Sequence, residues 1–74
     1  MPAESLQNTL RVERARNQLT QEELAELVGV TRKTINTVEN GRFIPSTMLA
    51  LKLARALHST VETLFYLTAA PGGS

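Results

Sequence analysis

The chain has 74 residues, no cysteine and a single histidine, and its formal net charge at pH 7 is +1. A chain of this length forms at most one small domain with a modest core. The absence of cysteine excludes disulfides and thiolate metal sites, and one histidine argues against a histidine metal site. No apolar run approaches the roughly 20 residues that span a bilayer, so we expect a cytoplasmic protein without membrane segments.

Charge is distributed unevenly along the chain. Residues 31–55 carry five Lys or Arg and one Glu, whereas residues 1–30 carry three basic and five acidic residues. A basic segment is a weak indication of a polyanionic partner such as nucleic acid. The middle of the chain is therefore where a binding surface is expected.

Two helices are predicted in the first thirty residues. The first runs from about Ser5 to Asn17, where Leu6 and Leu10 lie one turn apart. The second opens at the TQEE stretch, residues 20–23, because its Thr can cap backbone N–H groups while the last Glu reaches back, as in a capping box. The apolar stripe of this second helix comprises Leu24, Leu27 and Val28.

A short third helix follows a three-residue turn that begins with glycine. Gly29 suits the left-handed conformation that ends the second helix, and Thr31 suits the cap of the third. Ile35 and Val38 are its expected buried residues, and the Asn40-Gly41 pair ends it. Two short helices joined by such a turn have the layout of a helix-turn-helix unit.

Two further helices are predicted after the turn. The fourth covers about residues 46–57, after Pro45, which keeps the preceding residue out of helical geometry. The residues of this helix that we expect to face inward are Met48, Leu51, Ala54 and Leu57. The fifth opens at a second capping box, residues 59–62, and runs to about Leu67. His58, between the two, is expected to end the fourth helix rather than act as a ligand or an acid–base group.

The apolar run LFYL, residues 64–67, is ambiguous. Four successive apolar residues cannot all face one helical core, so the run is either a short strand or a helix end covered by another subunit. Strands have little support elsewhere, so the predicted fold class is all-α. The predicted domain covers residues 5–67, with residues 1–4 and 68–74 as flexible tails.

The stretch TQEELAELVGVTRKTINTVENGR resembles the helix-turn-helix of the Cro/phage-repressor-like transcription regulators, the XRE family. The resemblance extends from about Leu10 to Leu67 and includes the IPS and LALKLARAL segments. The chain is similar to compact family members that consist of the DNA-binding domain plus a few residues. The resemblance implies a five-helix lambda-repressor-like domain with its motif at about residues 20–40, which binds a pseudo-palindromic operator in double-stranded DNA as a homodimer.

The resemblance also implies a role for individual residues, with residues 31–40 as the recognition helix. The positions expected to read or flank base edges are Arg32, Lys33, Asn36 and Thr37. The positions expected to contact the DNA backbone are Gln21, Thr31, Asn40 and Arg42. Arg and Lys match the two guanine acceptors of the major groove, whereas Asn matches adenine. Many family members carry glutamine at the position of Lys33, so their operator sequences do not transfer to this chain.

Two further expectations concern stability and assembly. Arg14 and Glu39 match an internal ion pair of some family members, although they could equally form a plain surface pair. Part of the apolar run near the end is expected to cover a two-fold partner. The residues of this expected dimer interface are Leu64, Phe65, Tyr66 and Leu67.

The sequence therefore predicts a DNA-binding transcription regulator that acts by repression. The alternative is an antitoxin-like or adaptor protein whose main role is to bind a protein partner such as a toxin. The chain contains no Asp, and no Glu stands beside His58 in sequence, so no catalytic constellation is present. An enzyme, a cofactor and a metal site are accordingly not expected.

Overall fold

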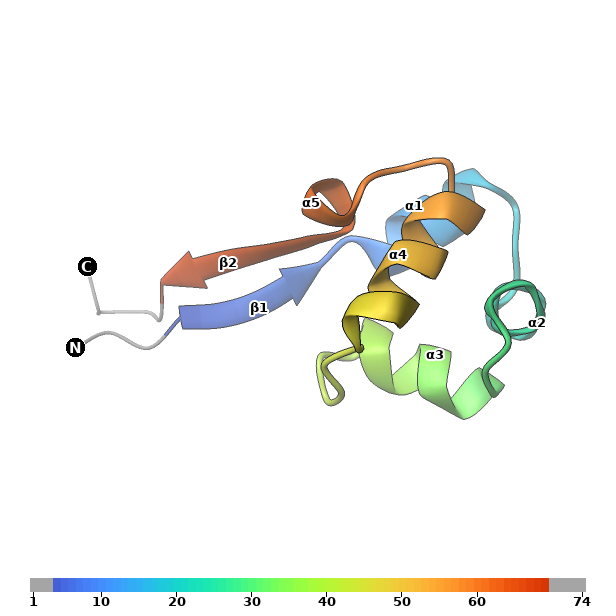
Figure 1. Ribbon diagram of the computed structural model, residues 1–74, viewed down its shortest axis with the longest axis horizontal. Helices are drawn as coiled ribbons and strands as arrows, with labels where there is room; N and C mark the ends of the chain where they lie inside the picture. Colours follow the sequence, from blue (N-terminus) through green and yellow to red (C-terminus); the bar gives the residue numbers. More distant parts are fainter. Residues whose placement is uncertain (1–3, 70–74) are drawn as a thin grey trace.

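Five helices form one body, and a two-stranded antiparallel ribbon projects from it (Figure 1). This computed structural model describes residues 4–69. In chain order the elements are β1 (Glu4–Asn8), α1 (Leu10–Arg16), α2 (Gln21–Val28), α3 (Arg32–Glu39), α4 (Thr47–Ala56), α5 (Val61–Leu64) and β2 (Phe65–Ala69). The ribbon contributes to an elongated shape, with extents of 39 × 21 × 20 Å.

The ribbon shows that the all-α prediction was wrong in part. Residues from Ser5 onward form β1 rather than the first turns of a helix, and α1 begins only at Leu10. The last helix ends at Leu64 instead of Leu67, and the ambiguous LFYL run continues as a strand from Phe65. The hydrogen-bonding partner of each strand is the other strand, about 60 residues away in the chain, so local helix signals could not reveal the pairing.

The strands also move the ends of the folded domain outward. Glu4 was expected in the N-terminal tail and Thr68 and Ala69 in the C-terminal tail, but all three lie in the paired ribbon. The rest of the two expected tails, residues 1–3 and 70–74, lies outside the described residues.

Polar contacts fasten the ribbon to the helical body where β1 turns into α1. The Asn8 side chain satisfies the first backbone N–H of α1, because its Oδ1 accepts from the N–H of Leu10 at 3.0 Å. Its Nδ2 donates to the carbonyl of Val38 at the end of α3, also at 3.0 Å. The backbone N–H of Thr9 donates to the carbonyl of Leu64 at 2.9 Å. These contacts therefore fasten the ribbon to α1, α3 and α5.

The predicted caps of α2 and α3 are confirmed. Thr20 and Glu23 form both hydrogen bonds of the capping box, and Thr31 caps α3 by accepting from the Thr34 backbone N–H. Gly29 and Gly41 follow the two helices with φ of 76° and 74°, a backbone conformation that residues with a Cβ adopt only at an energetic cost. These local signals fix the length and the connection of the two motif helices.

The inward faces of α2 and α4 differ from the prediction at three residues. Leu27, Met48 and Leu51 are exposed, the last two by 67% and 58%. In α4 the buried residues are Leu49, Ala50, Leu53 and Ala54, and Leu57 follows them. Because apolar residues occupy more than one side of α4, the sequence contains two alternative stripes, and contacts with the other helices select between them.

The short α5 begins one residue later than expected. Thr60, and not Ser59, is its cap, since the Thr60 hydroxyl accepts from the Thr63 backbone N–H at 3.1 Å. His58 has a left-handed backbone with φ of 54°, which agrees with its predicted place after α4. The core of the body consists of fully buried Leu10, Leu24, Ile35, Val38, Leu53, Leu57 and Leu64.

Candidate nucleic-acid interface

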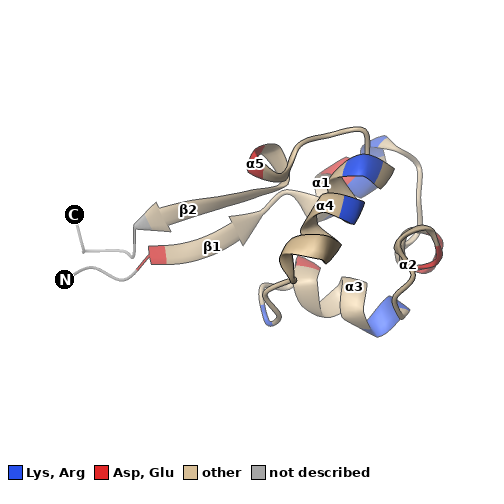
Figure 2. Cartoon of the chain, in the orientation of Figure 1, with Lys and Arg blue, Asp and Glu red and all other residues tan. Residues whose placement is uncertain are grey.

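The start of α3 presents two exposed cations on a rigidly anchored helix. Ile35 and Val38 are buried in the core, which fixes the rotation of α3 about its axis. Arg32 and Lys33 are exposed in its first turn, and together with Asn36 they line a shallow open groove. Figure 2 shows this basic patch at the end of α3 that adjoins α2. Both cations are thus free to reach a partner while the helix itself cannot turn.

The other two expected base readers are less free. Asn36 and Thr37 are half-buried. The Thr37 hydroxyl donates to the carbonyl of Thr34 at 2.9 Å, which leaves its methyl group and its oxygen lone pairs for other contacts. Asn36 is engaged at both ends of its amide, with Gln21 and with Asn40. Any ligand of α3 would therefore contact Arg32 and Lys33 first. It would contact Asn36 and Thr37 only through the groups that their contacts within the protein leave unused.

The expected backbone-contact residues surround the two ends of α3. Thr31 uses its hydroxyl oxygen as the cap of α3, and Asn40 and Arg42 are exposed just beyond the end of that helix. The backbone N–H of Arg42 donates to the carbonyl of Thr37 at 2.9 Å, so the chain after Gly41 is held against α3. Gln21, in the first turn of α2, is half-buried and points toward α3.

A carboxylate closed off from solvent joins the first three helices. The Glu39 side chain is 0% exposed, and its Oε2 lies 2.7 Å from Nε of Arg14, whose side chain is 17% exposed. Its Oε1 also accepts from Nε2 of Gln21 at 3.1 Å. The predicted Arg14–Glu39 ion pair is confirmed, and it is internal rather than a plain surface pair. It fastens α1 and α2 to the end of α3.

Arg11 is a polar participant that the sequence did not suggest. Its Nη2 donates to Oδ1 of Asn40 at 3.4 Å, and its Nε lies 3.6 Å from Oε1 of Glu39. The signal that could have found it is its position three residues before Arg14, on the same face of α1. Arg11 adds a positive charge beside the end of α3.

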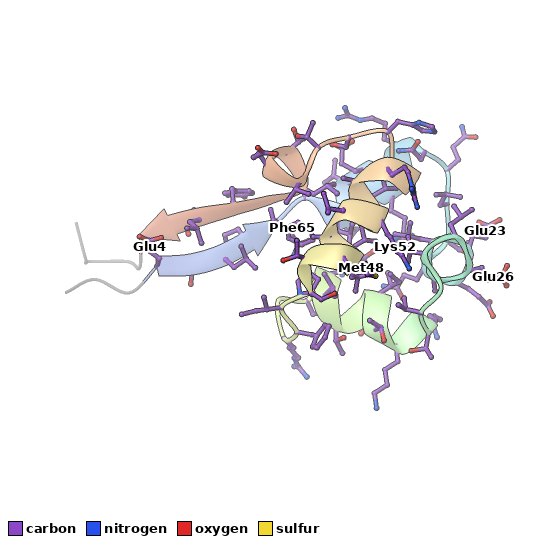
Figure 3. The ribbon with its side chains drawn as sticks, viewed as in Figure 1. Glu4, Glu23, Glu26, Met48, Lys52 and Phe65 are labelled. Atoms are coloured by element: carbon purple, nitrogen blue, oxygen red, sulfur yellow. The ribbon has the colours of Figure 1, made fainter. Side chains whose placement is uncertain are left out.

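Exposed acidic residues lie on α2. Glu22, Glu23 and Glu26 are exposed on α2. Figure 3 shows Glu23 and Glu26 on the outer side of α2, while Lys52 lies on α4.

Within residues 4–69 no three His, Asp or Glu side chains are grouped so that they could hold a metal ion. No helix in that part of the chain is both long and apolar enough to cross a membrane.

The candidate dimer residues do not share one surface. Leu64 was expected at the interface, but it is 0% exposed in the core, so it cannot contact a partner in this conformation. Leu67 pairs with Leu6 and Phe65 with Asn8 across the ribbon, which puts these side chains on one face. Tyr66 lies on the opposite face, because successive side chains of a strand alternate.

Comparisons with known proteins agree with this geometry. The family model described as helix-turn-helix matches residues 10–64. An uncharacterized HTH-type transcriptional regulator of Bacillus subtilis, YgzD, is 42% identical over 62 residues, which are 84% of this chain and 94% of that protein. An uncharacterized HTH-type transcriptional regulator of Methanothermobacter thermautotrophicus is 49% identical over 63 residues, which are 84% of this chain and 91% of that protein.

Two solved structures share the fold. The restriction-modification controller protein C.AhdI of Aeromonas hydrophila has a TM-score of 0.71 and 41% identity, over 76% of this chain and 81% of that one. The clp gene regulator ClgR of Corynebacterium glutamicum has a TM-score of 0.68 and 35% identity, over 70% of this chain and 55% of that one. With its anchored α3, its two glycine-ended motif helices and these relatives, the chain belongs to the XRE-type helix-turn-helix family of transcriptional regulators.

Proposed function

We propose that this regulator binds a pseudo-palindromic operator as a homodimer and represses transcription by occupying the promoter. The observation that carries the proposal is the exposure of Arg32 and Lys33 in the first turn of a helix fixed by Ile35 and Val38. Recognition helices of this motif contact base edges through their N-terminal residues. Repression by occlusion requires no surface beyond those that bind DNA and the second subunit.

The base readers divide by chemistry. Arg32 and Lys33 donate to guanine O6 and N7, so each half-site contains at least one G·C pair under the start of α3. Asn36 reads adenine through the N–H and the lone pair that its contacts inside the protein leave over. The Thr37 methyl group contacts a thymine methyl. Arg32 and Lys33 supply the larger part of the discrimination because they are exposed, whereas Asn36 and Thr37 are half-buried.

The backbone contacts set the position of α3 in the groove. Asn40 and Arg42 bind phosphates beyond the end of α3, and Gln21 binds one from the start of α2 with its second amide proton. The backbone N–H groups around Thr31 face a phosphate of the same DNA strand, since the start of a helix favours anions. These contacts carry no sequence information, so they raise the affinity for all DNA alike.

The second subunit covers the apolar face of the ribbon. Leu6 and Phe65 line an open apolar groove together with Ile44 and Leu51, and Figure 3 labels Phe65 where β2 meets the helical body. Leu67, on the same ribbon face, is 63% exposed. A two-stranded ribbon is marginally stable alone in water, so this one gains stability from a second copy. The two recognition helices then enter half-sites roughly 34 Å apart, about one helical turn.

Competition between DNA duplexes tests the base-reading assignment. Arg32→Ala and Lys33→Ala should each lower the discrimination at one base step by about 1–3 kcal/mol, because a bidentate contact to guanine is lost. Arg55→Ala is the matched control, since it removes an exposed cation from α4 instead of α3. If both α3 variants select the same sequence with wild-type affinity, the assignment is wrong.

A further inference from the structure

Five polar side chains at the junction of α1, α2 and α3 form a closed ring of contacts. Nη2 of Arg11 donates to Oδ1 of Asn40 at 3.4 Å, and Nδ2 of Asn40 donates to Oδ1 of Asn36 at 3.0 Å. Nδ2 of Asn36 lies 3.5 Å from Oε1 of Gln21, and Nε2 of Gln21 donates to Oε1 of Glu39 at 3.1 Å. Nε of Arg11 closes the ring at 3.6 Å from the same Glu39 oxygen.

Two members of the ring, Glu39 and Arg11, can each take only one role in a hydrogen bond. A carboxylate only accepts hydrogen bonds and a guanidinium only donates them, whereas each amide can turn either end toward a neighbour. Because Glu39 accepts, Gln21 turns its nitrogen to Glu39 and its oxygen to Asn36. Asn36 then donates to Gln21 and accepts from Asn40, whose oxygen accepts from Arg11. The ring therefore has one direction, which Arg11 favours from Asn40 and Glu39 from Gln21. Glu39 is the stronger determinant, because its side chain is 0% exposed, whereas that of Arg11 is 67% exposed and contacts Asn40 at 3.4 Å.

We propose that Glu39 is a positioning residue for DNA recognition, which acts by fixing the orientation of the amide groups of Gln21 and Asn36. This inference rests on the proposed function, because it assigns those amides to DNA. Adenine offers an acceptor at N7 beside a donor at N6, so an asparagine reads it in only one of its two amide orientations. With the orientation already fixed in the free protein, the wrong orientation does not compete when DNA binds.

The internal position of Glu39 supports this role over a purely structural one. Arg14 already neutralises the carboxylate at 2.7 Å, so tying the helices together does not require Gln21 or Arg11. The additional contacts instead lead from the carboxylate outward to Asn36 and to exposed Asn40, both on the helix that carries the basic patch. The ring thus connects a shielded charge to the surface assigned to DNA.

The test uses Glu39→Gln, which keeps the shape of the side chain but can donate or accept. Asn36→Ala first identifies the base step that Asn36 reads, where wild type should show a preference of roughly tenfold or more, as a bidentate contact provides. Glu39→Gln should reduce that preference to less than about threefold, under conditions where circular dichroism shows the same folded fraction for both proteins. Arg14→Met is the matched control, because it breaks the ion pair and leaves the direction of the ring unchanged; it should keep the preference.

A double variant separates positioning from stability. Gln21→Glu combined with Glu39→Gln moves the acceptor-only group to position 21, where it again forces Asn36 to donate. The preference at the Asn36 step should return, although the added charge near phosphates weakens binding to all sequences. A wild-type preference that survives in Glu39→Gln, or that fails to return in the double variant, would overturn the inference.

The remaining outcomes separate this inference from the proposed function. If Asn36→Ala alters no base preference, Asn36 reads no base and the inference fails, while discrimination by Arg32 and Lys33 can still stand. If wild type binds all duplexes equally, the proposed function fails as well. Side-chain amide NMR of the DNA-free protein gives an independent readout: the Gln21 signals should show one orientation in wild type and in Arg14→Met, and averaging in Glu39→Gln. One unchanged orientation in Glu39→Gln overturns the inference.

Discussion

Replacing Glu39 by alanine should destabilise the fold far more than loss of a surface charge would. The Glu39 side chain is 0% exposed, and it accepts from Nε of Arg14 at 2.7 Å and from Nε2 of Gln21 at 3.1 Å. Glu39→Ala removes the acceptor of both and leaves Arg14, whose side chain is 17% exposed, without its counter-charge. The damage therefore comes from the partners left behind as much as from the lost contact.

The structure limits the size of this effect. Breaking a buried ion pair on one side typically costs roughly 3–5 kcal/mol. Arg14 keeps one partner, because its Nη1 donates to the carbonyl of Leu19 at 2.8 Å. The expected loss is therefore at the lower end, about 3 kcal/mol. At roughly 4–8 °C per kcal/mol for a domain of this size, Tm should fall by about 12–24 °C.

Urea unfolding at one fixed protein concentration measures the loss, because the stability of a dimer depends on protomer concentration. Glu26→Ala is the control: Glu26 is exposed on α2, and its loss should change the free energy of unfolding by less than about 0.5 kcal/mol. In a cycle with Arg14→Ala, the two residues should show a coupling energy above about 1 kcal/mol. A loss below about 1 kcal/mol for Glu39→Ala would show that the Arg14–Glu39 pair contributes no more than an exposed pair does.

Three further predictions concern the DNA backbone, the ribbon and the motif turn. Arg42→Ala should weaken binding to all sequences alike and lower the slope of log affinity against log salt by about 1, measured by titration at several salt concentrations; an unchanged slope would exclude a phosphate contact. Leu67→Glu should give a monomer at micromolar concentration in sedimentation analysis, whereas Thr68→Glu, on the opposite face of the ribbon, should not; a wild-type monomer would exclude the proposed dimer. Gly29→Ala should cost about 1 kcal/mol of unfolding free energy through the left-handed backbone alone, because no atom lies within 4 Å of an added Cβ; a loss above roughly 3 kcal/mol would point to another cause.

The motif helices could be predicted because their signals are local. Thr20 caps α2 through a residue three positions on, Thr31 does the same for α3, and Gly29 carries its left-handed backbone by itself. Exposure of Arg32 and Lys33 then follows from the burial of Ile35 and Val38 on the same short helix. No long-range information enters any of these steps.

The ribbon could not be predicted from the same signals. Leu6 and Leu67 face each other across two strands from opposite ends of the chain, so neither end indicates its partner. Leu6 and Leu10 also have the spacing of a helical stripe, which favoured the wrong element. Long-range pairing decided the structure at both ends of the chain.

The polar ring was only partly accessible from sequence. The resemblance to the XRE family suggested the Arg14–Glu39 pair and a DNA-backbone contact for Gln21, but an amide has no charge pattern that would indicate its neighbour within the protein. The contact of Arg11 with Asn40 depends on how α1 lies against α3, and that of Asn36 with Gln21 on how α2 lies against α3, which only three-dimensional packing determines. Sequence therefore identified the surface of the candidate site but not the network behind it.

Selection of bound sequences from random duplex DNA tests whether the protein recognises DNA as a dimer through α3. Wild-type protein should enrich two symmetry-related half-sites about one helical turn apart, each with a G·C pair where α3 begins. Lys33→Ala or Arg32→Ala should relax that step and leave the spacing unchanged. A pool without an enriched sequence, or a single site without a symmetric partner, would contradict recognition by a dimer through α3.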